Sequence, residues 1–196
     1  APNIPPSNFT CLTRLDEERL RGFCARKMTD IVGSHVKGSD VDNVFIFGNH
    51  SNTQVAYVGE GTCKVNADAA PISIADAFSP EEFAAVLNRV QNRGAEIMRH
   101  LQVSSAMSAA EATAKHLRDW LDKSSSPRSA FSMGILLNTN TYGINPGIVY
   151  SVPCVRSSDA PCGYEAVSSY FIPEPTLELM RLSEAELLGE RQEVEE

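Results

Sequence analysis

The sequence predicts a single domain of mixed helices and strands, with an antiparallel strand meander near its carboxyl end. Apolar residues recur at helical spacing over residues 12–32 and in the stretch that begins at Ser79. Residues 130–138, 147–155 and 164–172 have the composition of strands, and loops rather than helices separate them. Strands that follow one another without intervening helices favour antiparallel pairing.

The amino-terminal part is expected to contain an extended segment, a helix and a loop. Residues 1–8 are rich in proline, which favours extended backbone. Residues 12–32 follow a helical period, and Gly33 is the expected end of that helix. The polar and glycine-containing residues 33–40 predict a loop.

Two strand signals follow this loop. The run Val44–Phe47 is short and rich in β-branched and aromatic residues, which predicts a buried strand that ends at Gly48. Residues 52–66 alternate loosely between apolar and polar side chains. We expect them to form a hairpin that turns about Gly59–Gly61.

The clearest helix start in the sequence is Ser79–Glu82. Ser79 suits the N-cap, proline suits the first helical position, and Glu82 stands where a capping box places its acid. Gly94 interrupts the apolar pattern and is expected to loosen this helix. A second helix is predicted over about 105–122, and its many small residues suggest deep packing.

The carboxyl-terminal part is predicted to begin with a turn and to end with a helix. Ser124–Arg128 has the composition of a turn before the three strands. A last helix is predicted over about 175–194, with Ser183 and Glu186 as a capping box inside it. Its acidic end is most simply a solvated tail.

Composition and charge exclude several classes of protein. The 196 residues carry 17 Lys and Arg against 25 Asp and Glu, a net charge of −8, with 42% hydrophobic residues. This chain is too apolar to be disordered and long enough to bury a core. The acidic balance argues against nucleic acid and against an anionic membrane as partners. Its apolar stretches are too short for a transmembrane span, and we predict no signal peptide.

The five cysteines do not predict a metal or redox site. They occur at positions 11, 24, 63, 154 and 162, with no C-x-x-C pair. Cys154 and Cys162 could in principle form a disulfide, but we expect reduced thiols packed as small apolar groups. No His, Cys and carboxylate combination has metal-ligand spacing, so no metal site is predicted.

Three residues are candidates for chemistry. Asp16 and Arg19 lie three apart on the first predicted helix and therefore share a face. His50 follows the strand 44–47 on a glycine- and asparagine-containing loop, a common place for reactive groups. A carboxylate bonded to one imidazole nitrogen fixes the tautomer and leaves the other nitrogen to exchange a proton. A neighbouring arginine can bind a carboxylate through two hydrogen bonds.

Spacing alone favours simpler interpretations of these residues. Asp16 and Arg19 have the spacing of an ordinary surface ion pair, and a lone histidine such as His50 is more often structural than catalytic. The other three histidines have no neighbouring signal, and we interpret them as structural or surface residues: His35, His100 and His116.

A resemblance raises the three candidates above those interpretations. Residues 8–19 contain L-T-R-L-D-E-E-R, which resembles the L-T-R-L-D-x-x-R segment of cytosolic-type malate dehydrogenases. Residues 48–54 are similar to the family's G-N-H-S-x-T-Q, and residues 104–110 to its S-S-A-M-S-A-A. Residues 131–134 and 142–153 resemble the strand motifs that follow. The motifs occur in order over nearly the whole chain.

The resemblance implies a fold and an activity. The fold is an α+β domain, like the carboxyl-terminal domain of lactate and malate dehydrogenases, with a twisted, mainly antiparallel sheet packed by long helices. The activity is reversible oxidation of malate to oxaloacetate with NAD as the cofactor. Matched by motif, His50 is the proton acceptor and donor, Asp16 orients it, and Arg19 binds a substrate carboxylate. Ser105, less surely Ser104, matches a serine of the substrate pocket, although a helix N-cap is an equally good interpretation.

The resemblance begins partway through the family's chain, so the amino-terminal Rossmann half and its nucleotide-binding loop have no counterpart here. We therefore expect residues 1–11 to be an extended remnant of the linker from that half, and residues 12–196 to be the substrate-binding and catalytic domain. Residues 28–40 are longer than the matching stretch of the family. Such a chain should bind NAD poorly alone. The resemblance further implies a cytoplasmic protein and a homodimer for the parent protein.

Two other functions remain open from the sequence. One is a dehydrogenase for another 2-hydroxy acid, for example an aromatic one, because Arg19 indicates only a carboxylate beside the reacting carbon. The other is a non-catalytic interaction or structural protein that kept the fold without a cofactor domain. The presence of Asp16, Arg19 and His50 argues weakly against it.

Overall fold

The computed structural model describes residues 3–66, 68–122, 130–160 and 162–195. The long helices in these ranges are α1 (Arg14–Val32), α2 (Pro80–Leu101), α3 (Ala106–Leu121) and α4 (Glu174–Glu195). The strands are β1 (Val41–Asp42), β2 (Phe45–Phe47), β3 (Val55–Tyr57), β4 (Thr62–Cys63), β5 (Ile72–Ser73), β6 (Phe131–Leu136), β7 (Val149–Arg156) and β8 (Tyr164–Ala166). Three short 3₁₀ turns span Pro6–Asn8, Gly38–Asp40 and Ala75–Ala77.

The strands form small antiparallel sheets, which confirms the expected α+β class. The predicted meander is present in the order β6-β7-β8, with Phe131 opposite Cys154. A bridge between Gly48 and Ser151 joins the end of β2 to β7. The predicted hairpin over 52–66 is wrong. The hairpin required β3 and β4 to pair with each other across the 59–61 turn. Instead, β3 pairs with β2, whereas β4 pairs with β1 and β5.

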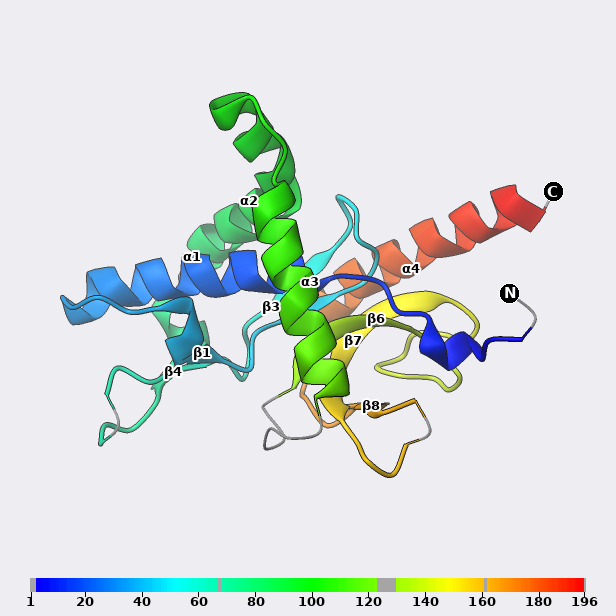
Figure 1. Cartoon of the computed structure of the whole chain (residues 1–196). Helices are drawn as coiled ribbons and strands as arrows, with labels where there is room; N and C mark the ends of the chain where they lie inside the picture. Colours follow the sequence, from blue (N-terminus) through cyan, green and yellow to red (C-terminus); the bar gives the residue numbers. More distant parts are fainter. Residues whose placement is uncertain (1–2, 67, 123–129, 161, 196) are drawn as a thin grey trace.

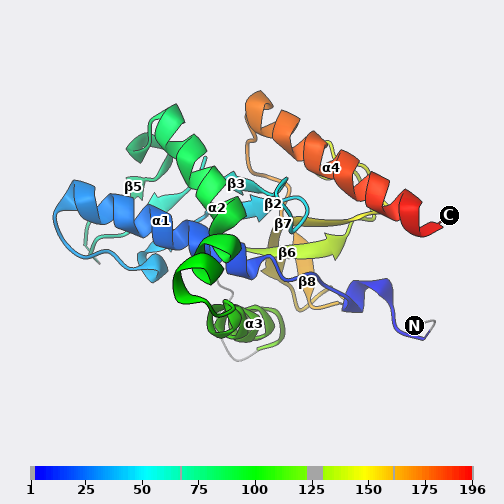
Figure 2. The ribbon, with the colours of Figure 1, turned by 90° about the horizontal axis from the view of Figure 1, so that it is seen from above.

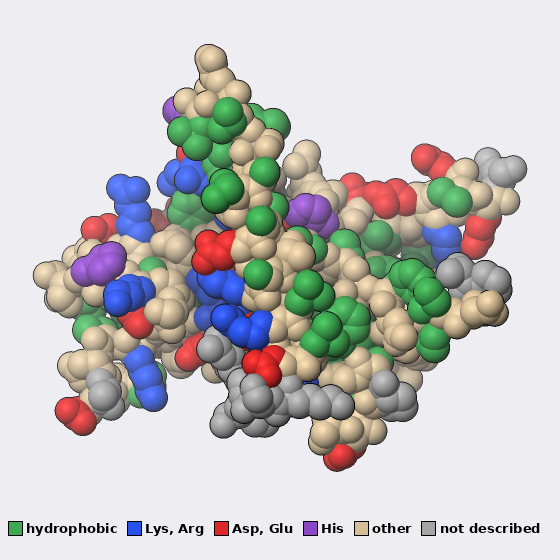
Figure 3. Space-filling view, viewed as in Figure 1, with side chains coloured by type: hydrophobic (Ala, Val, Ile, Leu, Met, Phe, Trp, Pro, Cys, Tyr) green, Lys and Arg blue, Asp and Glu red, His purple; other side chains and the backbone are tan. Residues whose placement is uncertain are grey.

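The helices lie on both sides of the strands (Figure 2), with α4 on one side and α3 on the other. α1 contacts β2 and β6. The end of α2 and the start of α3 project from the body as an arm (Figure 1). Hydrophobic side chains gather on this arm (Figure 3), and its exposed apolar residues include Met98, Leu101, Val103 and Met107.

Helix boundaries follow the capping signals of the sequence. α1 ends at Val32 and is capped by Gly33, whose φ of 70° is the left-handed conformation that glycine adopts readily. Ser79 and Glu82 form both hydrogen bonds of a capping box at the start of α2. The helix continues through Gly94 without a break. α4 is present as predicted, at Glu174–Glu195.

Some local expectations are wrong. The segment 1–8 is not extended throughout, because Pro6 begins a 3₁₀ turn. α3 is not deeply packed. Only three of its residues are buried, and they recur along one face: Ala112, His116 and Asp119. Most of the small side chains of α3 therefore meet solvent. The third predicted strand is shorter than 164–172, and the predicted turn 124–128 lies outside the described residues.

Two hydrophobic clusters make up the core. One surrounds the aromatic residues of β2, β3 and β7, and the other packs beneath α1 and α2. All five cysteines are free thiols; Cys24, Cys63 and Cys154 are buried as expected, whereas Cys11 is exposed. In the ranges that the structure describes, no helix is both long enough and apolar enough to cross a membrane.

Candidate active site

His50, Asp16 and Arg19 form one cluster where the first turn of α1 meets the end of β2. His50 Nδ1 lies 2.6 Å from Asp16 Oδ2. The other carboxylate oxygen of Asp16 accepts a hydrogen bond of 2.8 Å from Arg19 Nη1. The carboxylate thus stands between the imidazole and the guanidinium. The predicted trio is brought together, although its members are up to 34 positions apart in sequence.

The chain reaches this geometry through a tight turn after β2. Gly48 has a φ of 93°, a value that only glycine adopts without strain. Its backbone is bridged to Ser151 in both directions, by Gly48 N to Ser151 O at 3.2 Å and Ser151 N to Gly48 O at 3.0 Å. After this turn, Asn49 bonds to Ser183 of α4, and His50 meets Asp16 of α1.

Glu17, the residue after Asp16, fixes α1 against the sheet. Its side chain is fully buried and pairs with Arg14 at 3.3 Å and Arg21 at 3.0 Å. Its second oxygen accepts a hydrogen bond of 2.5 Å from the backbone N–H of Ser132 in β6. A buried carboxylate with several partners is strongly position-specific. This anchor sets the depth of the first turn of α1, and with it the place of Asp16.

The side chains of Asp16 and His50 differ sharply in burial. The Asp16 side chain is 0% exposed, whereas that of His50 is 45% exposed. The hydrogen bond that the imidazole donates to Asp16 raises the pKa of His50, although burial and the charge of Arg19 act in the opposite direction. With Nδ1 directed at Asp16, Nε2 is the nitrogen left to exchange a proton with a bound molecule.

Arg19 has an unused hydrogen-bonding edge. Its side chain is only 12% exposed, and its Nε is buried without a partner among the described residues. Buried donors are normally satisfied, and a guanidinium binds a carboxylate best through two parallel hydrogen bonds. The arrangement suits a carboxylate ligand next to His50.

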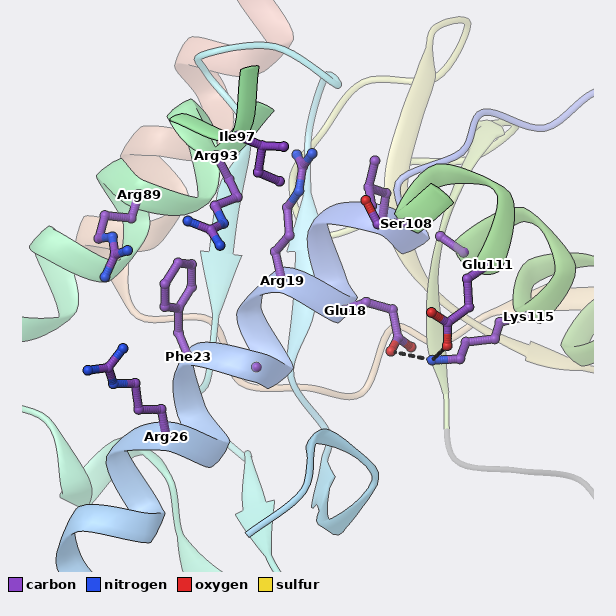
Figure 4. A pocket seen from close by; sticks show the side chains of 13 residues that line it. Glu18, Arg19, Phe23, Arg26, Arg89, Arg93, Ile97, Ser108, Glu111 and Lys115 are labelled. Carbon is purple, nitrogen blue, oxygen red and sulfur yellow. Dashed lines mark hydrogen bonds and ion pairs between the residues drawn. The ribbon is translucent and has the colours of Figure 1, made fainter. Parts of the chain in front are cut away.

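Arg19 also lines a cavity of about 420 Å³ between α1, α2 and α3. Figure 4 shows Phe23 and Arg93 on one side of Arg19, and Glu18 and Lys115 on the other. The guanidinium carbon of Arg89 lies 4.7 Å from the Phe23 ring centre. Asp16 and His50 are not among the lining residues. Only Arg19 connects the cluster to this space.

Sequence reasoning missed this cavity. Arg89 and Arg93 lie four apart on α2 and both bind Glu96, at 2.9 Å and 2.8 Å. Their spacing on one helix face was the available signal, but it does not reveal that Phe23 of α1 packs beneath them.

Ser105 is not joined to the cluster. It occupies the N-cap position of α3, but its side chain makes no capping hydrogen bond. The hydroxyl of Ser108 instead donates to the Ser105 carbonyl at 2.9 Å. Ser108 lines the cavity beside Arg19, whereas Ser104 lines a separate hollow at the end of α2. A role for Ser105 with substrate stays a prediction.

The remaining histidines lie apart from the cluster. His35 and His100 are exposed. His116 is buried, and its Nε2 lies 3.1 Å from Thr10 Oγ1. Burial and the charge of Arg14 lower its pKa.

Comparison with known proteins shows one consistent family. The family of the lactate/malate dehydrogenase alpha/beta C-terminal domain matches residues 13–196. The cytoplasmic malate dehydrogenase of Rattus norvegicus is 35% identical over 196 residues, covering 98% of this chain and 54% of that protein. That of Zea mays is 38% identical over 160 residues, covering 80% of this chain and 45% of that protein. The chain thus spans about half the length of the curated relatives it matches.

Solved structures give the same family. Lactate dehydrogenase of Trichomonas vaginalis, in complex with NADH and oxamate, has a TM-score of 0.84 and 26% identity, with 98% of this chain and 55% of that chain covered. Malate dehydrogenase of Naegleria fowleri has a TM-score of 0.77 and 31% identity, with 100% and 55% covered.

Proposed function

The chain belongs to the lactate/malate dehydrogenase family, as its alpha/beta C-terminal domain, and we propose that it is the substrate-binding and acid/base part of an NAD-dependent malate dehydrogenase. The observation that carries this proposal is the cluster itself. A half-exposed imidazole is paired with a buried carboxylate, beside an arginine whose Nε has no partner. These groups suit a substrate with a hydroxyl next to a carboxylate.

In malate oxidation, His50 Nε2 accepts the proton of the substrate hydroxyl. Asp16 holds the imidazole in the tautomer with its proton on Nδ1 and stabilises the imidazolium that results. In oxaloacetate reduction, the same nitrogen returns the proton to the carbonyl oxygen. General acid–base catalysis of this kind contributes about 10²- to 10⁴-fold in rate.

Arg19 binds the carboxylate beside the reacting carbon and so sets the substrate's orientation toward His50. Its Nη1 is held by Asp16 at 2.8 Å, which fixes the plane of the guanidinium. A flexible lysine would not present two parallel donors, so arginine is the appropriate residue here. Ser105 is proposed to contact substrate on the strength of its motif alone.

NAD supplies the hydride chemistry when it is bound. The residues of this chain suit the other two tasks of that reaction, which are proton exchange and binding of the substrate carboxylate. The Nε of Arg19 has no partner among the described residues, and a substrate carboxylate would supply one. The sequence contains no G-x-G-x-x-G loop, so we assign no residue of this chain to holding the cofactor.

The test is loss of NADH absorbance on addition of oxaloacetate to the longer enzyme that carries this chain, because the chain alone is expected to bind NAD poorly. The His50→Asn variant is expected to lose at least about 100-fold in kcat. The His35→Asn variant is the matched control, since His35 is exposed and outside the cluster. Arg19→Lys is expected to raise KM. Turnover that survives His50→Asn, or absence of turnover in the unmodified enzyme that carries this chain, contradicts the proposal.

A second candidate is dehydrogenation of another 2-hydroxy acid. The solved structure of a lactate dehydrogenase superimposes on this chain with a TM-score of 0.84, and Arg19 does not distinguish among 2-hydroxy acids. The kcat/KM values for oxaloacetate, pyruvate and phenylpyruvate separate the candidates. We propose that oxaloacetate is preferred, because the sequence relatives are malate dehydrogenases.

For the whole protein we further propose a cytoplasmic location and a homodimer. The cytoplasmic location rests on the names of the sequence relatives. Light scattering on the purified protein tests the dimer, and a monomer at micromolar concentration contradicts it.

A further inference from the structure

The loop that carries His50 is held from a distant helix. Glu186 of α4 accepts three hydrogen bonds from this loop through a single carboxylate oxygen. The donors are Asn49 Nδ2 at 3.1 Å, Ser51 Oγ at 2.5 Å and Thr53 Oγ1 at 2.5 Å. Two of these donors are the residues immediately before and after His50. Glu186 therefore ties down both sides of the histidine.

Ser183, one helical turn earlier on α4, holds the same loop. Its Oγ accepts a hydrogen bond of 2.8 Å from the backbone N–H of Asn49 and lies 3.0 Å from Thr53 Oγ1. The side chain is fully buried. It also lies directly against Gly48, where an added Cβ would come within 2.3 Å of its Oγ. The absence of a side chain at Gly48 thus lets α4 approach the loop this closely.

These contacts replace the capping box expected inside α4. Ser183 and Glu186 have the spacing of such a box, but both lie in the interior of the helix. The spacing of three residues places them on the same helix face. That face is turned toward residues 49–53, and both side chains bind the loop there.

We propose that Glu186 and Ser183 are positioning residues for His50, which hold its loop so that the imidazole meets Asp16. The proposal rests on the proposed function only in giving His50 an acid/base role. Within the described residues, no hydrogen bond or ion pair joins either side chain to His50 itself. The charged groups that face the imidazole are Asp16 and Arg19, both from α1. Glu186 therefore acts through the backbone of the loop.

A carboxylate suits this task better than a neutral group. It is a pure acceptor, so all three donors of the loop can point at it without competition. Burial raises the pKa of Glu186, but the hydrogen bonds from Ser51, Thr53 and Asn49 outweigh it, and the pKa lies below its ordinary value. The carboxylate is thus ionised at neutral pH, where its hydrogen bonds are strongest.

The first test measures the pKa of His50 by NMR titration of the imidazole Cε1–H signal in the 196-residue chain, without substrate or cofactor. In Glu186→Ala the loop loses its anchor, and the pKa of His50 is expected to fall toward that of Asp16→Asn. Glu193→Ala is the matched control. Glu193 is an exposed glutamate on the same helix. In the Glu193→Ala variant, the pKa of His50 should match that of the unmodified chain.

Two further variants separate positioning from a general effect on folding. Glu186→Gln keeps an acceptor oxygen, so it should restore most of the His50 pKa. Ser183→Ala removes the acceptor for the Asn49 N–H and should lower the pKa in the same direction as Glu186→Ala. The buried His116 serves as an internal reporter, since its titration should be unchanged wherever the fold is intact. If Glu186→Ala fails to fold, Glu186→Gln and Ser183→Ala decide the question.

The second test measures kinetics in the enzyme that carries the chain. Glu186→Ala is expected to lower kcat by up to about 100-fold, as a small misplacement of a catalytic group does. KM should stay within about 2-fold, because Arg19 is untouched. Glu186→Gln should recover most of kcat.

The two proposals fail in different ways. An unchanged pKa of His50 in both Glu186→Ala and Ser183→Ala, with folded protein, overturns the positioning role even if the enzyme is a malate dehydrogenase. Equal losses of kcat in Glu186→Ala and Glu193→Ala also overturn the positioning role. If His50→Asn leaves turnover intact, the proposed function fails, while the NMR result still decides whether α4 positions the imidazole.

Discussion

Replacing Gly48 by alanine is expected to destabilise the protein, because two independent features of this position require glycine. Its φ is 93°, and an added Cβ would lie 2.3 Å from Ser183 Oγ and 2.9 Å from Ser183 Cβ. Neither contact can be tolerated, so the buried serine must shift. That movement breaks the hydrogen bond of 2.8 Å that it accepts from the Asn49 N–H.

The size of the effect can be worked out from these terms. Strained backbone of this kind costs about 1–3 kcal/mol. A buried amide left without its acceptor costs about a further 1–3 kcal/mol. Alanine also reduces the freedom of the unfolded chain, which returns about 0.4–1 kcal/mol. The unfolding free energy is therefore expected to fall by about 1–5 kcal/mol, against the roughly 5–15 kcal/mol of a typical domain.

Urea unfolding followed by far-ultraviolet circular dichroism measures this loss. Gly189→Ala is the matched control, since Gly189 lies inside α4 with nothing within 4 Å of an added Cβ. It should stabilise the protein by up to about 1 kcal/mol, because alanine is the better helix former. If the unfolding free energy of Gly48→Ala lies within about 0.5 kcal/mol of that of the unmodified chain, the reasoning is refuted. The loop would then not depend on the close approach of α4.

Three further predictions concern buried charge, pH and capping. Glu17→Gln should lower the unfolding free energy by about 3–5 kcal/mol, since it removes the fully buried carboxylate charge that pairs with both Arg14 and Arg21; a loss below about 1 kcal/mol in urea unfolding contradicts this. Asp16→Asn should lower the pKa of His50, which the Asp16 hydrogen bond raises in the folded chain. A raised folded pKa stabilises the protein below the unfolded value, and that contribution is lost as pH rises through the folded value. The stability difference from the unmodified chain should therefore be largest near pH 5.5 and shrink by about pH 9; a constant difference argues against it. Ser79→Ala should cost about 1 kcal/mol through loss of the capping box of α2, whereas Ser79→Asp should be nearly neutral in the same unfolding assay.

Local signals in the sequence determined much of this protein. The ends of α1 and α2 follow from Gly33 and from Ser79–Glu82, because capping depends on residues within one helical turn. The pairing of Asp16 with Arg19 follows from their spacing on one helix. The meander follows from strand composition without intervening helices.

Pairing between distant segments could not be predicted in the same way. The failed hairpin over 52–66 shows this, since alternation of side chains indicates a strand but not its partner. The deep packing expected of α3 failed for a related reason. Small residues permit close approach of another element, but they do not supply one.

The candidate site combines both kinds of information. The sequence by itself supplied Asp16, Arg19 and His50, through helix spacing and through motifs that resemble a known family. Only the tertiary structure decided that His50 Nδ1 meets Asp16 at 2.6 Å, and that α4 holds the loop that carries His50. Glu186 lies 136 positions after His50, and its contacts depend on how α4 packs beside β3. A local pattern cannot encode such a contact, because it arises from the packing of elements that are formed independently along the chain.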